Sequence, residues 1–132
     1  MFGRNLDDAD EWVRSWTAQA SARAEAAQQM SDRVTGLTSV ATAADGAIKV
    51  TVAGSGVVTG LELDDRVQRM SGRELAAEIL KAMQKAQAGL TEKVVAVVQE
   101  TVGGETETGR AVIGSFERRF PAPDETEGER HD

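Results

Sequence analysis

One amphipathic helix near the N-terminus constrains this 132-residue chain more than any other feature. Apolar side chains recur every three or four residues over roughly residues 8–37, a spacing typical of a helix that packs against another helix. The members of this apolar seam are Val13, Trp16, Ala20, Ala27, Met30, Val34 and Leu37, with Arg23 interrupting the series. Four acidic residues between Asp7 and Glu11 favour a helix start there, because carboxylates stabilise the positive end of the helix dipole. Gly36 is a stop signal near the other end.

Three short strands are predicted after this helix, at residues 39–43, 47–53 and 57–63. The second strand alternates apolar and polar side chains, which indicates one buried face and one solvent face. The third strand is expected to direct three apolar side chains to one face, namely Val57, Leu61 and Leu63. The turns between the strands are Asp45-Gly46 and Gly54-Ser55-Gly56. The pattern predicts a three-stranded antiparallel meander.

A second long helix is predicted from Ser71 to about Val98, since Ser71 precedes Glu74 by three residues as in a capping box. The fold class is therefore α+β: a long N-terminal helix, a three-stranded antiparallel sheet and a long second helix. We divide the chain into one α-β-β-β-α domain at residues 1–103, a short amphipathic helix within 104–120 and a disordered acidic tail at 121–132.

The length of the first helix predicts a homodimer. A helix of about 30 residues is about 45 Å long, whereas a strand of about seven residues spans about 23 Å. About half of the helix would overhang its own sheet, and a second copy is the simplest cover for it. The alternative is that the seam lies on the chain's own sheet. The predicted dimer interface consists of Trp12, Val13, Trp16, Ala20, Met30 and Val34.

The residue inventory offers little for catalysis. The chain has no Cys and no Tyr, and its one His is His131 in the predicted tail. The common nucleophile–base pairs and thiolate metal sites therefore have no members. Asp64 and Asp65 are adjacent, which favours a turn over an acid–base pair. The glycine turn at 54–56 lacks the Lys and Ser/Thr of a phosphate loop. We predict a non-catalytic protein with no metal site and no cofactor.

Charge and hydropathy bear on location and partners. Residues 1–10 have no apolar run, and no stretch is long and apolar enough for a membrane span, so a cytoplasmic location without membrane contact is expected. The net charge is −7, of which residues 104–132 carry −4 (8 acids, 4 bases) and residues 1–103 carry −3 (14 acids, 11 bases). Indiscriminate phosphate binding is disfavoured, but a local basic patch is compatible with this distribution.

The central motif, DGAIKVTVAGSGVVTGLELDD at residues 45–65, resembles the signature of the YbaB/EbfC family. Gly46 is followed by alternating apolar residues, then by the Gly54 and Gly56 turn, a second strand and the Leu63-Asp64 pair. The following helix, with EILKAMQKAQ at residues 78–87, is also similar, and the resemblance covers about residues 8–103. Two features depart from the family pattern: the N-terminal helix opens with two Trp and four acids, and an acidic extension follows from Glu105.

The resemblance implies a nucleoid-associated dimer with paired sheets and projecting helices that binds double-stranded DNA, with a role in nucleoid organisation or gene regulation. The residues expected to contact DNA phosphates are Arg66, Arg69, Arg73, Lys81 and Lys85. The alternative function is a protein-interaction adaptor, such as a secretion-associated scaffold or chaperone of the same fold. Its apolar contacts to a partner would be Trp12, Trp16, Phe116 and Phe120.

Overall fold

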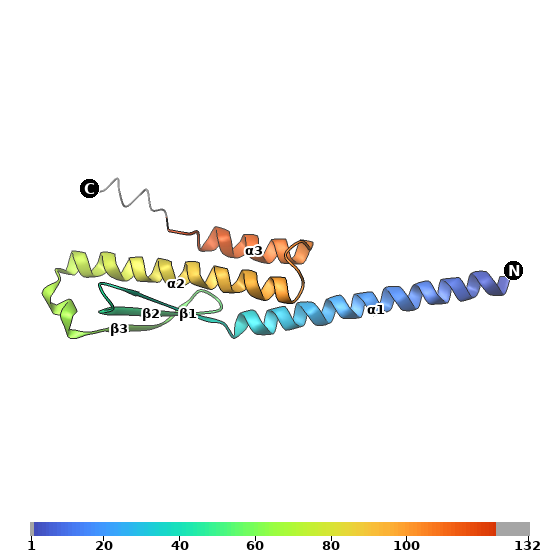
Figure 1. The fold of residues 1–132 in the computed structure, drawn as a ribbon, viewed down its shortest axis with the longest axis horizontal. Helices are drawn as coiled ribbons and strands as arrows, with labels where there is room; N and C mark the ends of the chain where they lie inside the picture. The colour runs from blue at the N-terminus through green and yellow to red at the C-terminus, as the bar shows by residue number, and fades with distance from the viewer. Residues whose placement is uncertain (1, 124–132) are drawn as a thin grey trace.

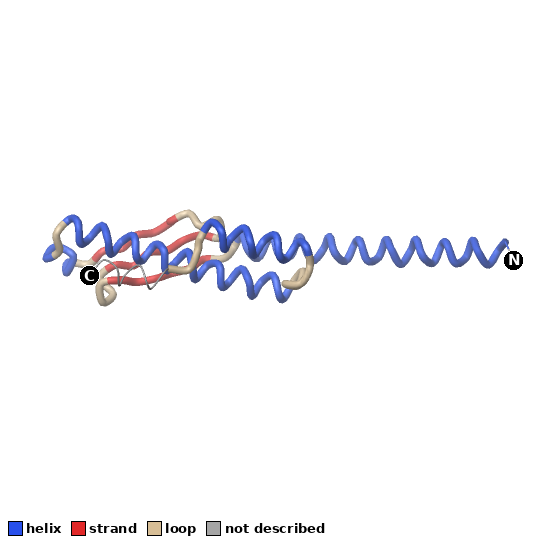
Figure 2. Tube along the Cα trace, turned by 90° about the horizontal axis from the view of Figure 1, so that it is seen from above, coloured by secondary structure: helices blue, strands red, loops and turns tan. Residues whose placement is uncertain are grey.

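The computed structural model describes residues 2–123, and it confirms the predicted α+β class. The elements in chain order are α1 (Phe2–Thr35), β1 (Thr38–Ala43), β2 (Ile48–Ala53), β3 (Val58–Leu63), the 3-10 helix η1 (Asp65–Arg69), α2 (Gly72–Glu100) and α3 (Glu107–Arg119). Figure 1 shows the sheet, α2 and α3 stacked as successive layers, with α2 between the other two. Most of α1 extends away from this body, as Figure 2 shows from a second direction.

The sheet is antiparallel throughout, in the order β1-β2-β3. Its central strand places Ile48, Val50 and Val52 on one face, where all three are fully buried. The long helix α2 covers this face and contributes Leu90 and Val94 to the same core. The strict alternation in β2 therefore reflects a sheet with one face under a helix and the other open to solvent.

The third strand differs from the prediction in one detail. An irregularity between Thr51 and Val52 shifts the β2–β3 register, so that Val58 lies opposite Val52 and Val57 falls outside the strand. Val58, and not Val57, therefore shares a face with Leu61 and Leu63. The two leucines remain 47% and 44% exposed, because α2 packs over β1 and β2 while β3 forms the sheet edge.

Helix α1 begins at Phe2, earlier than the predicted start near Asp8, and no acidic residue lies in its first turn. Its C-terminal part packs on the body, where Met30 is buried and Val34 is half-buried against the core. Every residue from 6 to 25 is exposed. The seam is thus covered at its C-terminal end by its own chain and is left uncovered within this chain along the overhang (residues 6–25).

Both remaining helices have N-terminal caps, and the cap of α2 is the predicted one. Ser71 is the N-cap of α2, and its Oγ accepts a hydrogen bond of 3.1 Å from the backbone N–H of Glu74. Thr106 caps α3 in the same manner, with Gly109 as the donor. Residues 121–123 have no regular secondary structure, and the rest of the predicted disordered tail lies outside the described residues. Within the described part of the chain, no helix is apolar over a length sufficient to cross a membrane.

Candidate nucleic-acid interface

The five predicted DNA-contacting residues lie on two consecutive elements. Arg66 and Arg69 belong to η1, and the other three belong to the first half of α2. Figure 1 places η1 and the start of α2 at the end of the body opposite the α1 overhang. The β1–β2 turn adjoins them, since the end of β1 and this turn (residues 42–46) line one groove of about 420 Å³ together with Glu78, Lys81 and Lys85. The fold therefore brings together basic residues that are up to 19 positions apart in the sequence.

Arg66 has a structural role in this arrangement. Its guanidinium donates to the carboxylate of Asp64 at 2.6 Å and to the backbone carbonyl of Asp45 at 3.1 Å. The hydrogen bonds from Arg66 hold the pKa of Asp64 below its usual range, and the same pair raises the pKa of the Arg66 guanidinium. Asp64 also caps η1 by accepting from the Arg66 backbone N–H, as expected for a turn residue.

The other four basic residues, which we call the basic end, are Arg69, Arg73, Lys81 and Lys85. All four are exposed, and none forms an ion pair with any residue in the described range 6–123. By contrast, Arg33, Lys49 and Arg110 each pair with a glutamate. Glu74 and Glu78 also lie on this part of α2, so the surface is mixed in charge. The basic end can nevertheless offer unengaged cations to phosphate oxygens.

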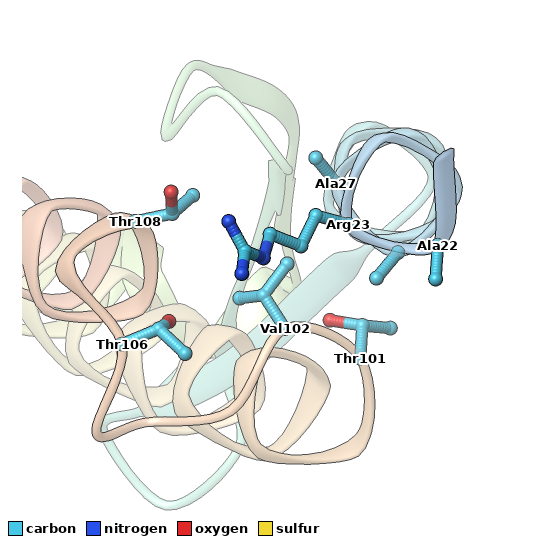
Figure 3. Close-up of a pocket in the computed structure, with 8 residues that line it drawn as sticks. Ala22, Arg23, Ala27, Thr101, Val102, Thr106 and Thr108 are labelled. Carbon is cyan, nitrogen blue, oxygen red and sulfur yellow. The ribbon is translucent and has the colours of Figure 1, made fainter. Parts of the chain in front are cut away.

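A second groove, of about 280 Å³, lies between α1 and the α2–α3 connection. Figure 3 shows Arg23 extending from α1 past Val102 toward Thr108. The rest of the lining consists of Ala, Val and Thr side chains, so Arg23 is the only charged group. Among the described residues, no three His, Asp or Glu side chains are grouped closely enough to hold a metal ion.

The aromatic residues near the C-terminus serve the chain's own packing. Phe116 is buried in the core, and the Phe120 ring lies over Gly56 in the β2–β3 turn. Arg119 stacks its guanidinium on both rings, at 5.3 and 4.8 Å from their centroids, and donates to the Ser55 carbonyl at 2.8 Å. Phe116 is therefore not a free contact for a protein partner and Phe120 is half-buried, whereas Trp12 and Trp16 of that predicted set are exposed.

Comparison with known families agrees with this geometry. The family model described as the YbaB/EbfC DNA-binding family matches residues 11–105. The chain belongs to this family. The match begins in α1, includes the whole sheet and α2, and ends before α3, which is thus an addition to the part that the YbaB/EbfC model describes. A search of curated protein sequences found no significant match.

The sequence alone selected the five basic residues, but it did not show that one of them has a different role from the others. The pairing of Arg66 with Asp64 has a local signal, because an acid and a base two residues apart directly follow a strand. The contact of Arg66 with the Asp45 carbonyl has none, since it depends on the β1–β2 turn lying beside η1. Only the fold distinguishes Arg66 from the basic end.

Proposed function

We propose that this protein is a non-catalytic, nucleoid-associated protein that binds double-stranded DNA as a homodimer. The observation that carries the proposal is the match of residues 11–105 to a DNA-binding family. The unpaired cations of the basic end support it, because such side chains can neutralise phosphates without first breaking an internal ion pair. The proposed location is the cytoplasmic nucleoid, with gene regulation as a consequence of DNA occupancy.

Binding of this kind would depend mainly on charge. Lys and Arg contacts to phosphates fix a protein on DNA but read no sequence, so we expect little sequence preference. Four cations from each of two protomers fall in the range of about six to ten phosphate contacts. Affinity in that range drops about 10³- to 10⁵-fold between about 50 and 200 mM salt. The net charge of −7 repels DNA phosphates from the rest of the protein, so the attraction would be confined to the basic end.

The dimer is proposed on the uncovered seam. Trp12, Val13 and Trp16 project from the overhang as exposed apolar side chains, and Ala20 lies on the same helix face. Met30 and Val34 continue that face but already pack within the chain. We therefore propose that a second copy covers the first four residues and that the last two only anchor the helix to its body.

Charge reversal at the basic end tests the DNA-binding proposal. A random-sequence duplex is titrated with the protein at about 50 and 200 mM salt, and the titration is repeated with Lys81→Glu/Lys85→Glu. We expect the variant to lose affinity by at least tenfold at the lower salt. Its salt slope should also be shallower, because a protein with fewer phosphate contacts releases fewer counterions on binding.

The matched control is Arg110→Glu/Arg118→Glu on α3, which changes the net charge equally but lies outside the family match. It is expected to reduce affinity much less than the α2 variant. Equal losses in both variants would mean that only net charge matters and would overturn the assignment of the basic end. Absence of binding at about 50 mM salt would overturn the DNA-binding proposal itself.

The exposure of Trp12 and Trp16, at 67% and 58%, supports a second candidate, a protein-interaction adaptor that uses the overhang. The two candidates differ in what covers the tryptophans. A homodimer covers them in the purified protein, whereas an adaptor leaves them in water until another protein is added. An adaptor would also be insensitive to Lys81→Glu/Lys85→Glu.

A further inference from the structure

The path of the chain after α3 leads it onto α2. Phe120 is fixed against Gly56 of the β2–β3 turn, and the next residues, Pro121 to Pro123, line one groove with Gln84 and Gln87 of α2. Gln87 itself donates to the Gly56 carbonyl at 3.3 Å, so the groove is held between α2 and that turn. The last described residue, Pro123, therefore lies beside Gln84, which is inside α2 and not at either end of it.

Gln84 shares a helix face with two members of the basic end. Lys81 precedes it by three residues and Arg73 by eleven, and both spacings return to nearly the same side of an α-helix. Ala77 is the residue between them on this face, while Glu74 and Glu78 lie further around the helix beside Lys85. The face from Gln84 to Arg73, which we call the stripe, thus carries two cations, and Glu74 and Glu78 border it on the side of Lys81.

The remaining segment has the charge and the length to cover this stripe. Residues 124–132 contain five acids and one Arg, a net charge of −4 with His131 neutral. Nine extended residues reach about 30 Å, whereas the distance along α2 from Gln84 to Arg73 is about 16 Å. The segment starts beside one end of the stripe, so it is tethered where its carboxylates can reach both cations.

We propose that residues 124–132 bind across Lys81 and Arg73 and compete with nucleic acid for the basic end. The binding itself is independent of the proposed function, and only the competition rests on it. A tether of this length gives an effective concentration in the millimolar range. With an intrinsic dissociation constant of about 0.1–1 mM, the tail reduces DNA affinity about two- to tenfold. Salt weakens the contact, because its partners are exposed charges.

The first experiment needs no DNA. Backbone amide chemical shifts of the full chain at about 50 mM salt are compared with those of a full-length variant with a neutral tail, Asp124→Asn/Glu125→Gln/Glu127→Gln/Glu129→Gln/Asp132→Asn. We expect differences at Arg73, Ala77 and Lys81 that vanish at about 500 mM salt. Lys49, which pairs with Glu62 on the open sheet face, is the internal control and should not shift. Unchanged shifts along the stripe would overturn the proposed tail contact, whether or not DNA binds.

The second experiment measures competition. The neutral-tail variant is expected to bind a random duplex about two- to tenfold more tightly than the parent at about 50 mM salt. If the tail acted only through net charge, neutralising it would raise DNA affinity equally in every variant. The comparison is therefore repeated in a Lys81→Gln/Arg73→Gln protein, where we expect no gain in DNA affinity from the neutral tail. A gain that persists there would overturn competition at the stripe. Absence of DNA binding in all four proteins would overturn the proposed function, while the chemical shifts would still decide the tail contact.

Discussion

At the scale of single residues, two glycines determine how the layers meet. A Cβ added to Gly54 would lie 2.0 Å from the backbone carbonyl oxygen of Val34 at the end of α1. A Cβ on Gly56 would lie 2.0 Å from the Phe120 ring, and the backbone of Gly56 has a φ of +87°, which L side chains rarely adopt. The β2–β3 turn is therefore the point where α1, the sheet and the end of α3 converge.

We predict that Gly54→Ala destabilises the fold by about 1–3 kcal/mol, the usual cost of forcing extra atoms into a packed site. The neighbouring atom is backbone and cannot swing aside as a flexible side chain could. Chemical denaturation followed by circular dichroism measures the free energy of unfolding. Gly72→Ala is the matched control, because no atom lies within 4 Å of its added Cβ, and it should be neutral or slightly stabilising. Equal effects of the two substitutions would refute the close-approach argument.

At the scale of elements, local patterns predicted most of the fold. The three strands begin within one residue of their predicted positions, and Ser71 caps α2 as expected. These features follow from side-chain periodicity and capping chemistry, which are encoded in short stretches. The shift from Val57 to Val58 was not predictable, because both are valines and the register depends on pairing with β2. The early start of α1 was missed because acidic residues within the helix resembled an N-terminal cluster.

The candidate site was predictable to a similar extent. The sequence identified the bases around the start of α2, but the contact of Arg66 with the Asp45 carbonyl depends on three-dimensional proximity. Likewise, an amphipathic third helix was expected, yet nothing in its sequence showed that its apolar face covers α2 and the β2–β3 turn. The placement of Phe116 and Phe120 inside the chain follows from that packing.

The packing of α3 leads to a prediction about its role. Phe116 is part of the hydrophobic core although α3 lies outside the family match. We predict that Phe116→Ala destabilises the whole domain by about 3 kcal/mol, within the range for a buried Phe replaced by Ala. Urea denaturation should show a lower midpoint with an unchanged slope. Arg118→Ala, an exposed change on the same helix, is the control and should have little effect. A wild-type midpoint for Phe116→Ala would show that the packing of Phe116 does not stabilise the body.

At the scale of the whole molecule, the mismatch between α1 and its body is the dominant feature. The body is about as long as α2, whereas α1 continues well beyond it (Figure 1). Helices in water are stabilised mainly by burying an apolar face, and residues 6–25 have no such burial within the chain. The apolar face nevertheless continues from Val13 and Trp16 to the buried Met30, with one interruption at Arg23. A helix of this kind requires a second surface to complete its packing.

We predict that the purified protein is a dimer at micromolar concentration, as measured by light scattering after size exclusion. Trp12 and Trp16 are the only tryptophans in the chain, so fluorescence reports directly on the overhang. Their emission should shift to longer wavelength on dilution, because dissociation exposes both rings to water. Trp12→Glu/Trp16→Glu should give a monomer, since the dimer would bury two unpaired charges per copy. Ala18→Glu/Ser21→Glu adds the same charge on the helix side away from the tryptophans and should remain dimeric. A monodisperse monomer, or a dimer that tolerates the tryptophan substitutions, would show that the overhang does not form the interface and would leave its tryptophans to another partner.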